Sequence, residues 1–283
     1  MESGLEFLPL NVRKYLVEVF SLLFSYLGED NIVALYIFGS VIGEEYSDNS
    51  DLDLLVVLDD RITSKQIRYV SGVLESLEIN YGLCSMNCSF LGKILRTIER
   101  STGMFESHFV CRKGEVLKGC FEKVFKTNRF MSKLLAPSSI VFGSVLSRIM
   151  KIYGEDILKE VVVSKPTALT MIKSLAMNLV LSLFTLVIFP LSSKANKYEM
   201  ETAKWSTLAS YYYLKKGNPG LIEALKFFTN LGLPDSYFKR LLQLRKNYQN
   251  DIRFGLATPL YVLRIHAKTL NYSKNGVAGN TLR

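Results

Sequence analysis

The stretch FGSVIGEEYSDNSDLDLLVVL, residues 38–58, joins a Gly-Ser pair to an Asp-Leu-Asp triplet that opens an apolar run. The segment leading into it, IVALYIF at 32–38, is β-branched and aromatic, and it ends at Gly39. Such a short apolar run bounded by a turn residue predicts a buried strand, and LDLLVVL at 52–58 predicts another. A polar loop, residues 41–50, would return the chain to this second strand.

Two carboxylates stand at the start of the second strand. In a strand, side chains at i and i+2 project to the same face, so Asp51 and Asp53 point together. Two carboxylates this close repel, and burying them without a partner is costly. Mg²⁺ prefers oxygen ligands and is typically held by one or two carboxylates plus substrate phosphates. We therefore expect Asp51 and Asp53 to be metal ligands.

The Gly-Ser pair is suited to phosphate. Glycine lets the backbone approach a phosphate closely, and the hydroxyl of Ser40 can hold a phosphate oxygen beside Gly39. Taken alone, a Gly-Ser pair after a strand is more often a turn, and a lone Asp-x-Asp is more often a solvated strand edge. Found together between two buried strands, they favour a phosphate cradle facing a metal-binding pair.

Composition limits the class of protein. The chain has 283 residues, 48% of them hydrophobic and 22% charged, with a net charge of +9 and a pI near 9.2. A basic chain favours an anionic partner, although it can equally reflect a soluble surface. Four cysteines and two histidines do not indicate a disulfide scaffold or a structural metal site. The N-terminus lacks the pattern of a signal peptide, so we expect a cytoplasmic protein.

The first part of the chain alternates helices and strands. Apolar residues recur at the helical period over 10–27, and Gly28 is placed to end that helix. Thr63 and Gln66 form a capping box before another helical pattern. Further expected elements are strands at 79–90 and 103–112 and a helix from about 91 to 99. This order predicts an α+β fold with a mixed sheet.

Beyond Phe121 the strand patterns fade and long helical patterns follow. We therefore expect a catalytic domain at 1–122 and a helical substrate- or partner-binding domain at 123–270. The residues 271–283 lack apolar side chains in register and are expected to form a loose tail.

One segment of the helical half is long and apolar enough to span a bilayer. Residues 168–191 carry a single charge, Lys173. Yet Ser174, Asn178, Ser182 and Thr185 form a polar stripe at helical spacing. We favour the central helix of a bundle over a transmembrane helix, and we expect no membrane partner.

The order strand, Gly-Ser, spacer, Asp-x-Asp, strand resembles the signature of the DNA polymerase β-like nucleotidyltransferase superfamily. Within it, the match is to small archaeal and bacterial nucleotidyltransferase domains. The detailed resemblance covers residues 32–58, and the element order supports it loosely to about residue 120. It implies a polymerase β-like mixed sheet followed by an α-helical bundle domain.

The resemblance also implies roles for the motif residues. Gly39 and Ser40 would hold the β- and γ-phosphates of a nucleoside triphosphate such as ATP, and Asp51 and Asp53 would bind Mg²⁺. A nucleotidyl group would pass in line to an acceptor hydroxyl, with pyrophosphate leaving. A two-ion site is compatible with this chemistry. The acceptor could be a small molecule, an RNA end or a protein hydroxyl.

The family's third carboxylate is missing from its expected strand. Residues 79–90 contain no Asp or Glu, and the amides of Asn80 and Asn87 cannot act as a base. Glu106 is our candidate for the third catalytic acid, with Glu78 as a less favoured alternative. If neither serves, the alternative is a nucleotide-binding regulatory module that has lost turnover.

The helical half offers one further contact. Several families of this superfamily place a Lys near an aromatic residue against the triphosphate, and Lys204-Trp205 resembles that arrangement. Lys204 is accordingly a candidate nucleotide-binding residue. The alternative is a solvated ion-pair face formed by Lys197, Glu201 and Lys204, with Trp205 in the core.

Overall fold

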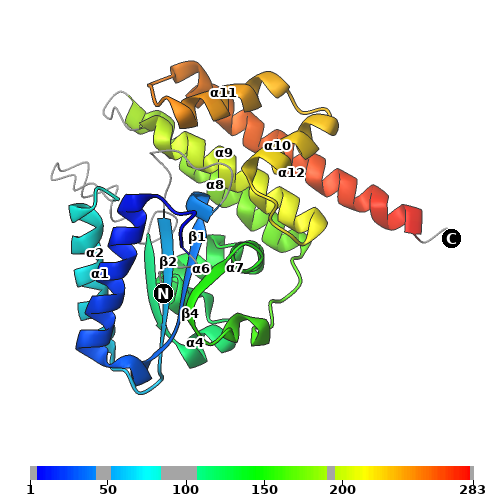
Figure 1. Cartoon of the computed structure of the whole chain (residues 1–283). Coiled ribbons are helices and arrows are strands. Elements are labelled where there is room, and N and C mark those ends of the chain that lie inside the picture. Colours follow the sequence, from blue (N-terminus) through cyan, green and yellow to red (C-terminus); the bar gives the residue numbers. More distant parts are fainter. Residues whose placement is uncertain (1–4, 43–51, 84–106, 190–194, 281–283) are drawn as a thin grey trace. The chain divides into compact units, whose positions relative to one another are not determined.

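The computed structural model describes residues 5–42, 52–83, 107–189 and 195–280, and the chain divides into two compact units. The first unit contains the described chain up to Ser132 together with Ile149–Val163. The second contains Lys133–Arg148 and the chain from Ser164 onward (Figure 1). Each unit has its own hydrophobic core.

The first unit is built on a four-stranded sheet in the order β3-β2-β1-β4. Its strands are β1 (Ile32–Gly39), β2 (Leu52–Leu58), β3 (His108–Arg112) and β4 (Met150–Gly154). Antiparallel neighbours flank β1 on both sides, whereas β2 and β3 run parallel. The mixed sheet and the two central buried strands expected from the sequence are confirmed.

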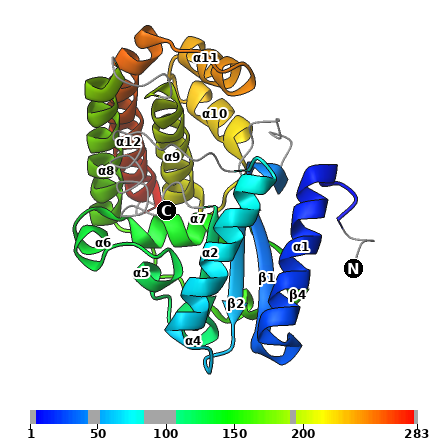
Figure 2. The ribbon, with the colours of Figure 1, turned by 90° about the vertical axis from the view of Figure 1, so that its left-hand side faces the viewer.

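Two long helices, α1 (Leu10–Leu27) and α2 (Ser64–Asn80), cover one face of this sheet (Figures 1 and 2). After α1, Gly28 adopts a φ of 77°, which ends the helix as expected. The capping box before α2 is formed: the amide of Gln66 donates to Thr63 Oγ1 at 3.3 Å, and the amide of Thr63 donates to Gln66 Oε1 at 3.0 Å.

The edge strand β4 was not expected, because no strand pattern was found beyond Phe121. It is short, partly exposed and pairs with β1. Gly154 ends it with a φ of 77°, and a Cβ there would stand 2.1 Å from the carbonyl oxygen of Val33. Because β4 returns to the sheet from far along the chain, the first compact unit extends past the expected boundary at residue 122.

The segment between α2 and β3 differs from expectation where it can be compared. Ile79 and Asn80 belong to the end of α2 rather than to a strand, and residues 81–83 form a turn. The rest of the expected strand at 79–90, the helix at 91–99 and the start of the strand at 103–112 lie outside the described residues. The first unit also contains the shorter helical elements η2 (Glu29–Asn31), η3 (Ser40–Ile42), α4 (Lys113–Leu117), α5 (Phe121–Val124) and η4 (Ile157–Glu160). Helix α6 (Arg129–Leu135) runs across the division between the two units.

The second unit is helical, as expected. Its elements are α7 (Ser138–Leu146), α8 (Ala168–Ile188), α9 (Ala195–Lys215), α10 (Leu221–Asn230), α11 (Asp235–Lys246) and α12 (Ile252–Asn280). Helices α8, α9 and α12 pack side by side (Figure 2), and α10 and α11 close a hydrophobic core against α9 and α12. Because α12 runs to Asn280, residues 271–280 are helical and not a loose tail.

Helix α8 buries its polar stripe together with Met171, Leu181 and Ile188, and it exposes other apolar side chains. Ser174, Ser182 and Thr185 are fully buried, and Asn178 is 1% exposed. The polar stripe read from the sequence thus faces the interior of the bundle. Among the described helices, α8 is the one long and apolar enough to cross a membrane by length and composition.

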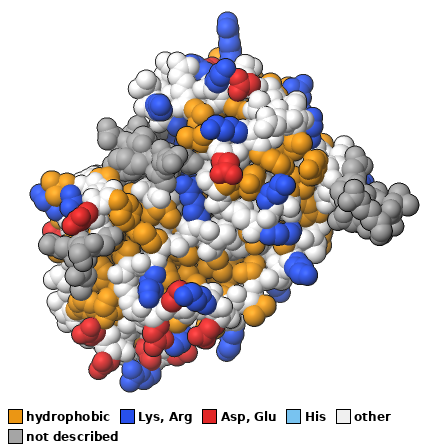
Figure 3. Space-filling view, turned by 45° about the vertical axis from the view of Figure 1, so that its right-hand side comes forward, with side chains coloured by type: hydrophobic (Ala, Val, Ile, Leu, Met, Phe, Trp, Pro, Cys, Tyr) orange, Lys and Arg blue, Asp and Glu red, His pale blue; other side chains and the backbone are white. Residues whose placement is uncertain are grey.

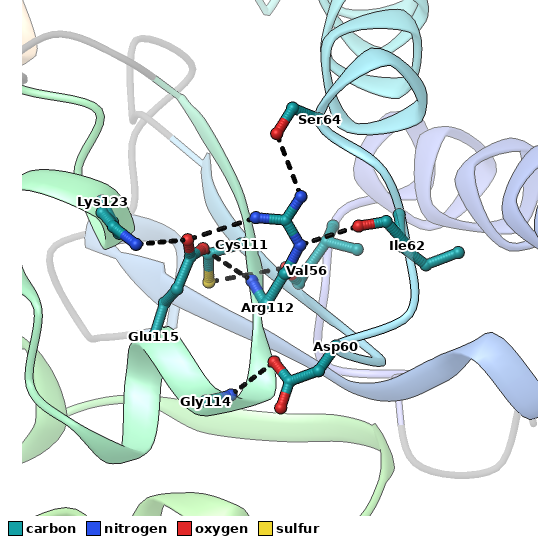
Figure 4. A network of polar contacts seen from close by, with 9 residues as sticks. All are labelled: Val56, Asp60, Ile62, Ser64, Cys111, Arg112, Gly114, Glu115 and Lys123. Carbon is teal, nitrogen blue, oxygen red and sulfur yellow. Dashed lines mark hydrogen bonds and ion pairs between the residues drawn. The ribbon is translucent and has the colours of Figure 1, made fainter.

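At the C-terminal ends of β2 and β3, Arg112 connects several neighbouring segments through hydrogen bonds (Figure 4). Its Nε donates to the carbonyl of Ile62 at 2.7 Å, and its Nη2 donates to Ser64 Oγ at 3.0 Å. The carboxylate of Glu115 accepts from the backbone amide of Arg112 at 3.1 Å and lies 3.4 Å from its Nη1. One planar guanidinium therefore connects the β2–α2 loop to α4.

We expect Arg112→Lys to lower the free energy of unfolding by about 1–3 kcal/mol, because a single ammonium cannot reproduce this fork of donors. Chemical denaturation measures the loss. Arg68→Lys, an exposed change on α2, is the matched control and should leave the free energy of unfolding unchanged. Equal stability of the two variants would show that the guanidinium contacts of Arg112 do not stabilise the fold.

Candidate functional site

Three of the residues singled out from the sequence, Gly39, Ser40 and Asp53, lie together where β1 ends and β2 begins. Gly39 lies opposite Leu52 in the antiparallel register of β1 and β2, and Phe38 lies opposite Asp53. The turn that carries Ser40 follows directly. Strand β3 begins at the same end of the sheet, since the amide of Leu54 donates to the carbonyl of Ser107 at 2.8 Å. Asp51 and Glu106 lie outside the described residues, so their roles remain predictions.

The Gly-Ser pair forms a tight, buried turn. Gly39 has a φ of 93°, a conformation that favours glycine, and Ser40 is 4% exposed. Within the described ranges of the chain, the Ser40 hydroxyl has no hydrogen-bond partner. A buried hydroxyl without a partner is unfavourable. A phosphate oxygen arriving at this turn would supply the missing partner.

Asp53 projects from the face of the sheet opposite α1 and α2. Its neighbours Leu52 and Leu54 point into the core beneath those helices, so alternation along β2 places Asp53 on the other face. The side chain is half-buried there, beside Phe38 in the register of β1. A carboxylate in this position is placed to meet a cation that arrives with a phosphate.

The described part of β3 supplies no carboxylate to that face. Strand β3 reads HFVCR, and the residues sharing the face with Asp53 are Phe109 and Cys111. The ring of Phe109 stacks on that of Phe38 at a centroid distance of 5.9 Å. Burial raises the pKa of the Cys111 thiol. The described part of β3 therefore presents apolar side chains beside Asp53.

Glu78, the less favoured candidate for the third acid, is committed elsewhere. It is 2% exposed at the end of α2, and its oxygens accept from Tyr15 Oη at 3.3 Å and Ser107 Oγ at 2.6 Å and lie 2.9 Å from His108 Nδ1. His108 shares a face with Leu54, not with Asp53. Burial, together with the nearby Glu78, raises the pKa of Tyr15.

This cluster was missed by the sequence reasoning. Two signals were present: Glu78 follows Leu74 by four residues on the core-facing side of α2, and His108 stands in an otherwise apolar strand. A carboxylate in a core-facing position needs buried partners. The partners come from α1 and β3, which no local pattern connects to α2.

Lys204 is held within the second unit. Its Nζ lies 2.7 Å from Glu201 Oε2 and 5.5 Å from the ring centroid of Trp205, and Arg245 Nη1 lies 2.9 Å from Glu201 Oε1. Burial alone would raise the pKa of Glu201, but the two cations and their hydrogen bonds hold it well below its usual range. The Glu201–Lys204 ion pair of the alternative interpretation is therefore present, but it is buried and not solvated, and Trp205 is only partly buried. Contact of Lys204 with a triphosphate remains a prediction.

Substitution of Ser40 tests whether the turn formed by Gly39 and Ser40, here called the phosphate turn, binds phosphate. We expect Ser40→Ala to weaken the binding of ATP about tenfold, or ~1.4 kcal/mol, by removing one hydrogen bond to phosphate. It should not lower the free energy of unfolding, because no described residue loses a partner. Calorimetric titration with ATP and chemical denaturation measure the two quantities.

The matched control is Ser139→Ala. Ser139 is also a buried serine whose hydroxyl lacks a partner among the described residues, but it belongs to α7 in the second unit. It should change neither nucleotide affinity nor stability. Unchanged ATP affinity in Ser40→Ala would contradict the assignment of this turn to phosphate.

The surface is suited to an anionic ligand. Lys and Arg side chains are spread over much of the face shown in Figure 3, in keeping with the net charge of +9. A field of this sign raises the local concentration of a polyanion such as a triphosphate. Within the described ranges there is no group of three or more His, Cys, Asp or Glu side chains that could bind a metal by itself.

Comparison with known proteins agrees with the geometry. A family model described as "Polymerase beta, Nucleotidyltransferase" matches residues 23–101, which include β1, β2 and the Gly39-Ser40 pair. A solved structure, spectinomycin adenyltransferase AAD(9) from Enterococcus faecialis with ATP and spectinomycin, is similar to this chain with a TM-score of 0.54. The two are 12% identical over 91% of this chain and 98% of that chain. No curated protein sequence matches the chain.

Proposed function

We propose that this chain, whose residues 23–101 match the polymerase β nucleotidyltransferase family, transfers a nucleotidyl group from a nucleoside triphosphate to a hydroxyl acceptor. The observation that carries the proposal is the sheet edge where the phosphate turn of Gly39 and Ser40 meets the start of β2 with Asp53. The buried Ser40 hydroxyl, which lacks a partner among the described residues, supports a ligand at that turn.

The reaction is a substitution at the α-phosphorus. A bond forms between the acceptor oxygen and that phosphorus while its bond to the bridging oxygen breaks, and pyrophosphate leaves. The acceptor proton passes to a base. The turn after β1 would orient the β- and γ-phosphates, and binding in one orientation contributes much of the rate in such reactions.

Asp53, together with Asp51, would hold Mg²⁺. The donor set suits that ion, since carboxylates and phosphate oxygens are its usual ligands. When bound, the ion would neutralise charge on the phosphates and on the leaving pyrophosphate. Glu106 remains our proposed third acid and Lys204 our proposed further phosphate contact.

The donor and acceptor are proposals with different support. The structural neighbour was solved with ATP and spectinomycin, so ATP is the first donor to test and a small hydroxylated compound the first acceptor. An identity of 12% shows a shared fold and does not carry the acceptor across. RNA ends and protein hydroxyls belong in the same acceptor panel. The cytoplasm remains our proposed location.

The test is release of pyrophosphate. The full-length protein is incubated with Mg²⁺, each of the four nucleoside triphosphates and an acceptor panel of aminoglycosides and related hydroxylated compounds, short RNAs and the protein itself. We expect pyrophosphate release that depends on both Mg²⁺ and one class of acceptor. No release with any acceptor, despite measurable nucleotide binding, would refute the proposed transfer.

One observation favours the alternative of a nucleotide-binding module without turnover. The described part of β3 has no acid on the Asp53 face, and Glu78 is occupied by Tyr15, Ser107 and His108. Without a base, the acceptor hydroxyl would react slowly. Tight, Mg²⁺-dependent nucleotide binding with no pyrophosphate release is the result that this alternative predicts.

A further inference from the structure

Two neighbouring helices of the second unit expose large apolar side chains. On α8 these are Leu169, Ile172, Val180, Leu183 and Val187, each at least half exposed. They recur at spacings of three, eight, three and four residues, so they form one stripe along the helix. On α12 the exposed apolar residues are Ile252, Leu256, Leu260 and Leu263, which are between 42% and 58% exposed. We call these nine residues the outer apolar face.

The two helices are adjacent and antiparallel. Ser174, near the start of α8, lies 3.2 Å from His266 Nε2 on α12. At the other end, a Cβ on Gly255 would stand 3.3 Å from the ring of Phe189, just after α8. The exposed apolar residues therefore lie on two neighbouring helices that run in opposite directions.

Hydrogen bonds on the buried side of α8 fix the rotation of this helix, with its apolar stripe exposed. Its opposite side carries Ser174, Asn178, Ser182 and Thr185, all buried, and Ser182 Oγ donates to the buried carboxyl of Glu199 at 2.6 Å. Rotating α8 to hide its apolar side would expose those hydrogen bonds and bury apolar groups against polar ones. The apolar stripe stays outside, and burying it against another apolar medium is favourable.

The charged residues of α8 and α12 indicate which kind of partner would cover the outer apolar face. The two helices contain Lys173, Arg253, Arg264, Lys268 and Lys274 and no Asp or Glu. Arg253 and Arg264 are exposed and flank the apolar residues of α12. Against a second copy of this chain, cations of one copy would meet cations of the other. Against anionic lipid they would be neutralised, and each gives a favourable contribution near such a surface.

We propose that the outer apolar face docks on the surface of a bilayer containing anionic lipid. Helix α8 lies in the interface and does not span it, because its polar side is bonded to α9 and α12. An apolar face flanked by basic residues is the pattern of interfacial helices. The proposal stands independently of the proposed nucleotidyl transfer, and it differs from the expectation that a membrane is not a partner.

The test is co-sedimentation of the full-length protein with extruded vesicles. We expect binding to phosphatidylcholine vesicles that contain phosphatidylglycerol to be about tenfold or more stronger than binding to phosphatidylcholine alone. The binding should weaken at 0.5 M NaCl, because salt screens the cations. Equal binding to both vesicles, or binding to neither, would overturn the proposal.

The variant is Leu183→Gln with Val187→Gln, both on the exposed side of α8. It should lose most vesicle binding while keeping the helical circular dichroism spectrum and melting temperature. The matched control is Val162→Gln, an apolar residue that is 87% exposed in the first unit, and it should bind vesicles like the natural protein. If light scattering instead shows a dimer that the double variant converts to a monomer, and vesicles do not bind, the face is an interface between copies and our proposal is wrong.

Discussion

Asp53→Asn should lower the rate of pyrophosphate release by about three orders of magnitude or more, since interactions of a bound divalent ion with the reacting phosphates are worth several kcal/mol. The substitution keeps the size of the side chain and removes its negative charge. An amide oxygen is a much weaker ligand for Mg²⁺ than a carboxylate. Asp53 is half-buried beside the turn of Gly39 and Ser40, where we propose that the phosphates bind.

Binding and turnover separate the possible roles of this carboxylate. Calorimetric titration with ATP should show that Mg²⁺ strengthens nucleotide binding to the natural protein but no longer does so in Asp53→Asn. In the presence of a chelator, the variant should bind ATP at least as well, because it has lost a charge that repels phosphate. Retained turnover in Asp53→Asn would remove Asp53 from the reaction.

Asp59→Asn provides the matched control. Asp59 follows the far end of the same strand and bonds to Arg61 at 2.8 Å, an exposed pair that contributes little to stability. The chemical change is identical to that at Asp53. Asp59→Asn should therefore leave the Mg²⁺ dependence, the ATP affinity and the rate of pyrophosphate release unchanged.

Glu199→Gln should change how stability depends on pH. Glu199, on α9, is fully buried against α8 and α12, and burial raises its pKa from 4.5 to about 8 despite the hydrogen bond from Ser182. At neutral pH the folded protein therefore keeps the proton that the unfolded chain has lost. Because the folded state binds more protons between pH 4.5 and 8, its stability falls as pH rises through that range.

His266 acts in the opposite direction over part of the range. Its pKa is lowered by burial from 6.5 to about 4, so the unfolded chain binds more protons there and stability rises with pH between 4 and 6.5. The two effects oppose each other up to pH 6.5. From pH 6.5 to 8 the Glu199 effect dominates.

We expect the natural protein to lose roughly 1–1.5 kcal/mol of unfolding free energy between pH 6.5 and 8, while Glu199→Gln stays nearly constant. Chemical denaturation at several pH values measures this. Glu223→Gln, an exposed change on α10, should keep the slope of the natural protein. A slope of the same size in Glu199→Gln would show that Glu199 does not carry the effect.

Much of the candidate site could be predicted because its information is local. A run of β-branched and apolar residues ending at Gly39 predicts β1, and the run after Asp53 predicts β2. Alternation within β2 then places Asp53 on the face away from α1 and α2 without knowledge of any distant contact. The helix periods of α1 and the capping box of α2 are local in the same way.

The features that were missed depend on residues far apart in the chain. Strand β4 joins the sheet through pairing with β1, and its sequence is short and only partly buried. The carboxylate of Glu78 is satisfied by Tyr15, Ser107 and His108, which come from two other elements. Such contacts leave no periodic pattern in either segment.

Helix α8 shows where the two kinds of information divide. Its sequence determines a helix with one polar and one apolar stripe, because residues at helical spacing share a face. Which stripe turns inward was decided by the tertiary structure: the carboxyl of Glu199 and the ring of His266 offer hydrogen bonds that the buried hydroxyls of Ser182 and Ser174 can meet. Buried polar groups require such partners, and the partners lie on other helices.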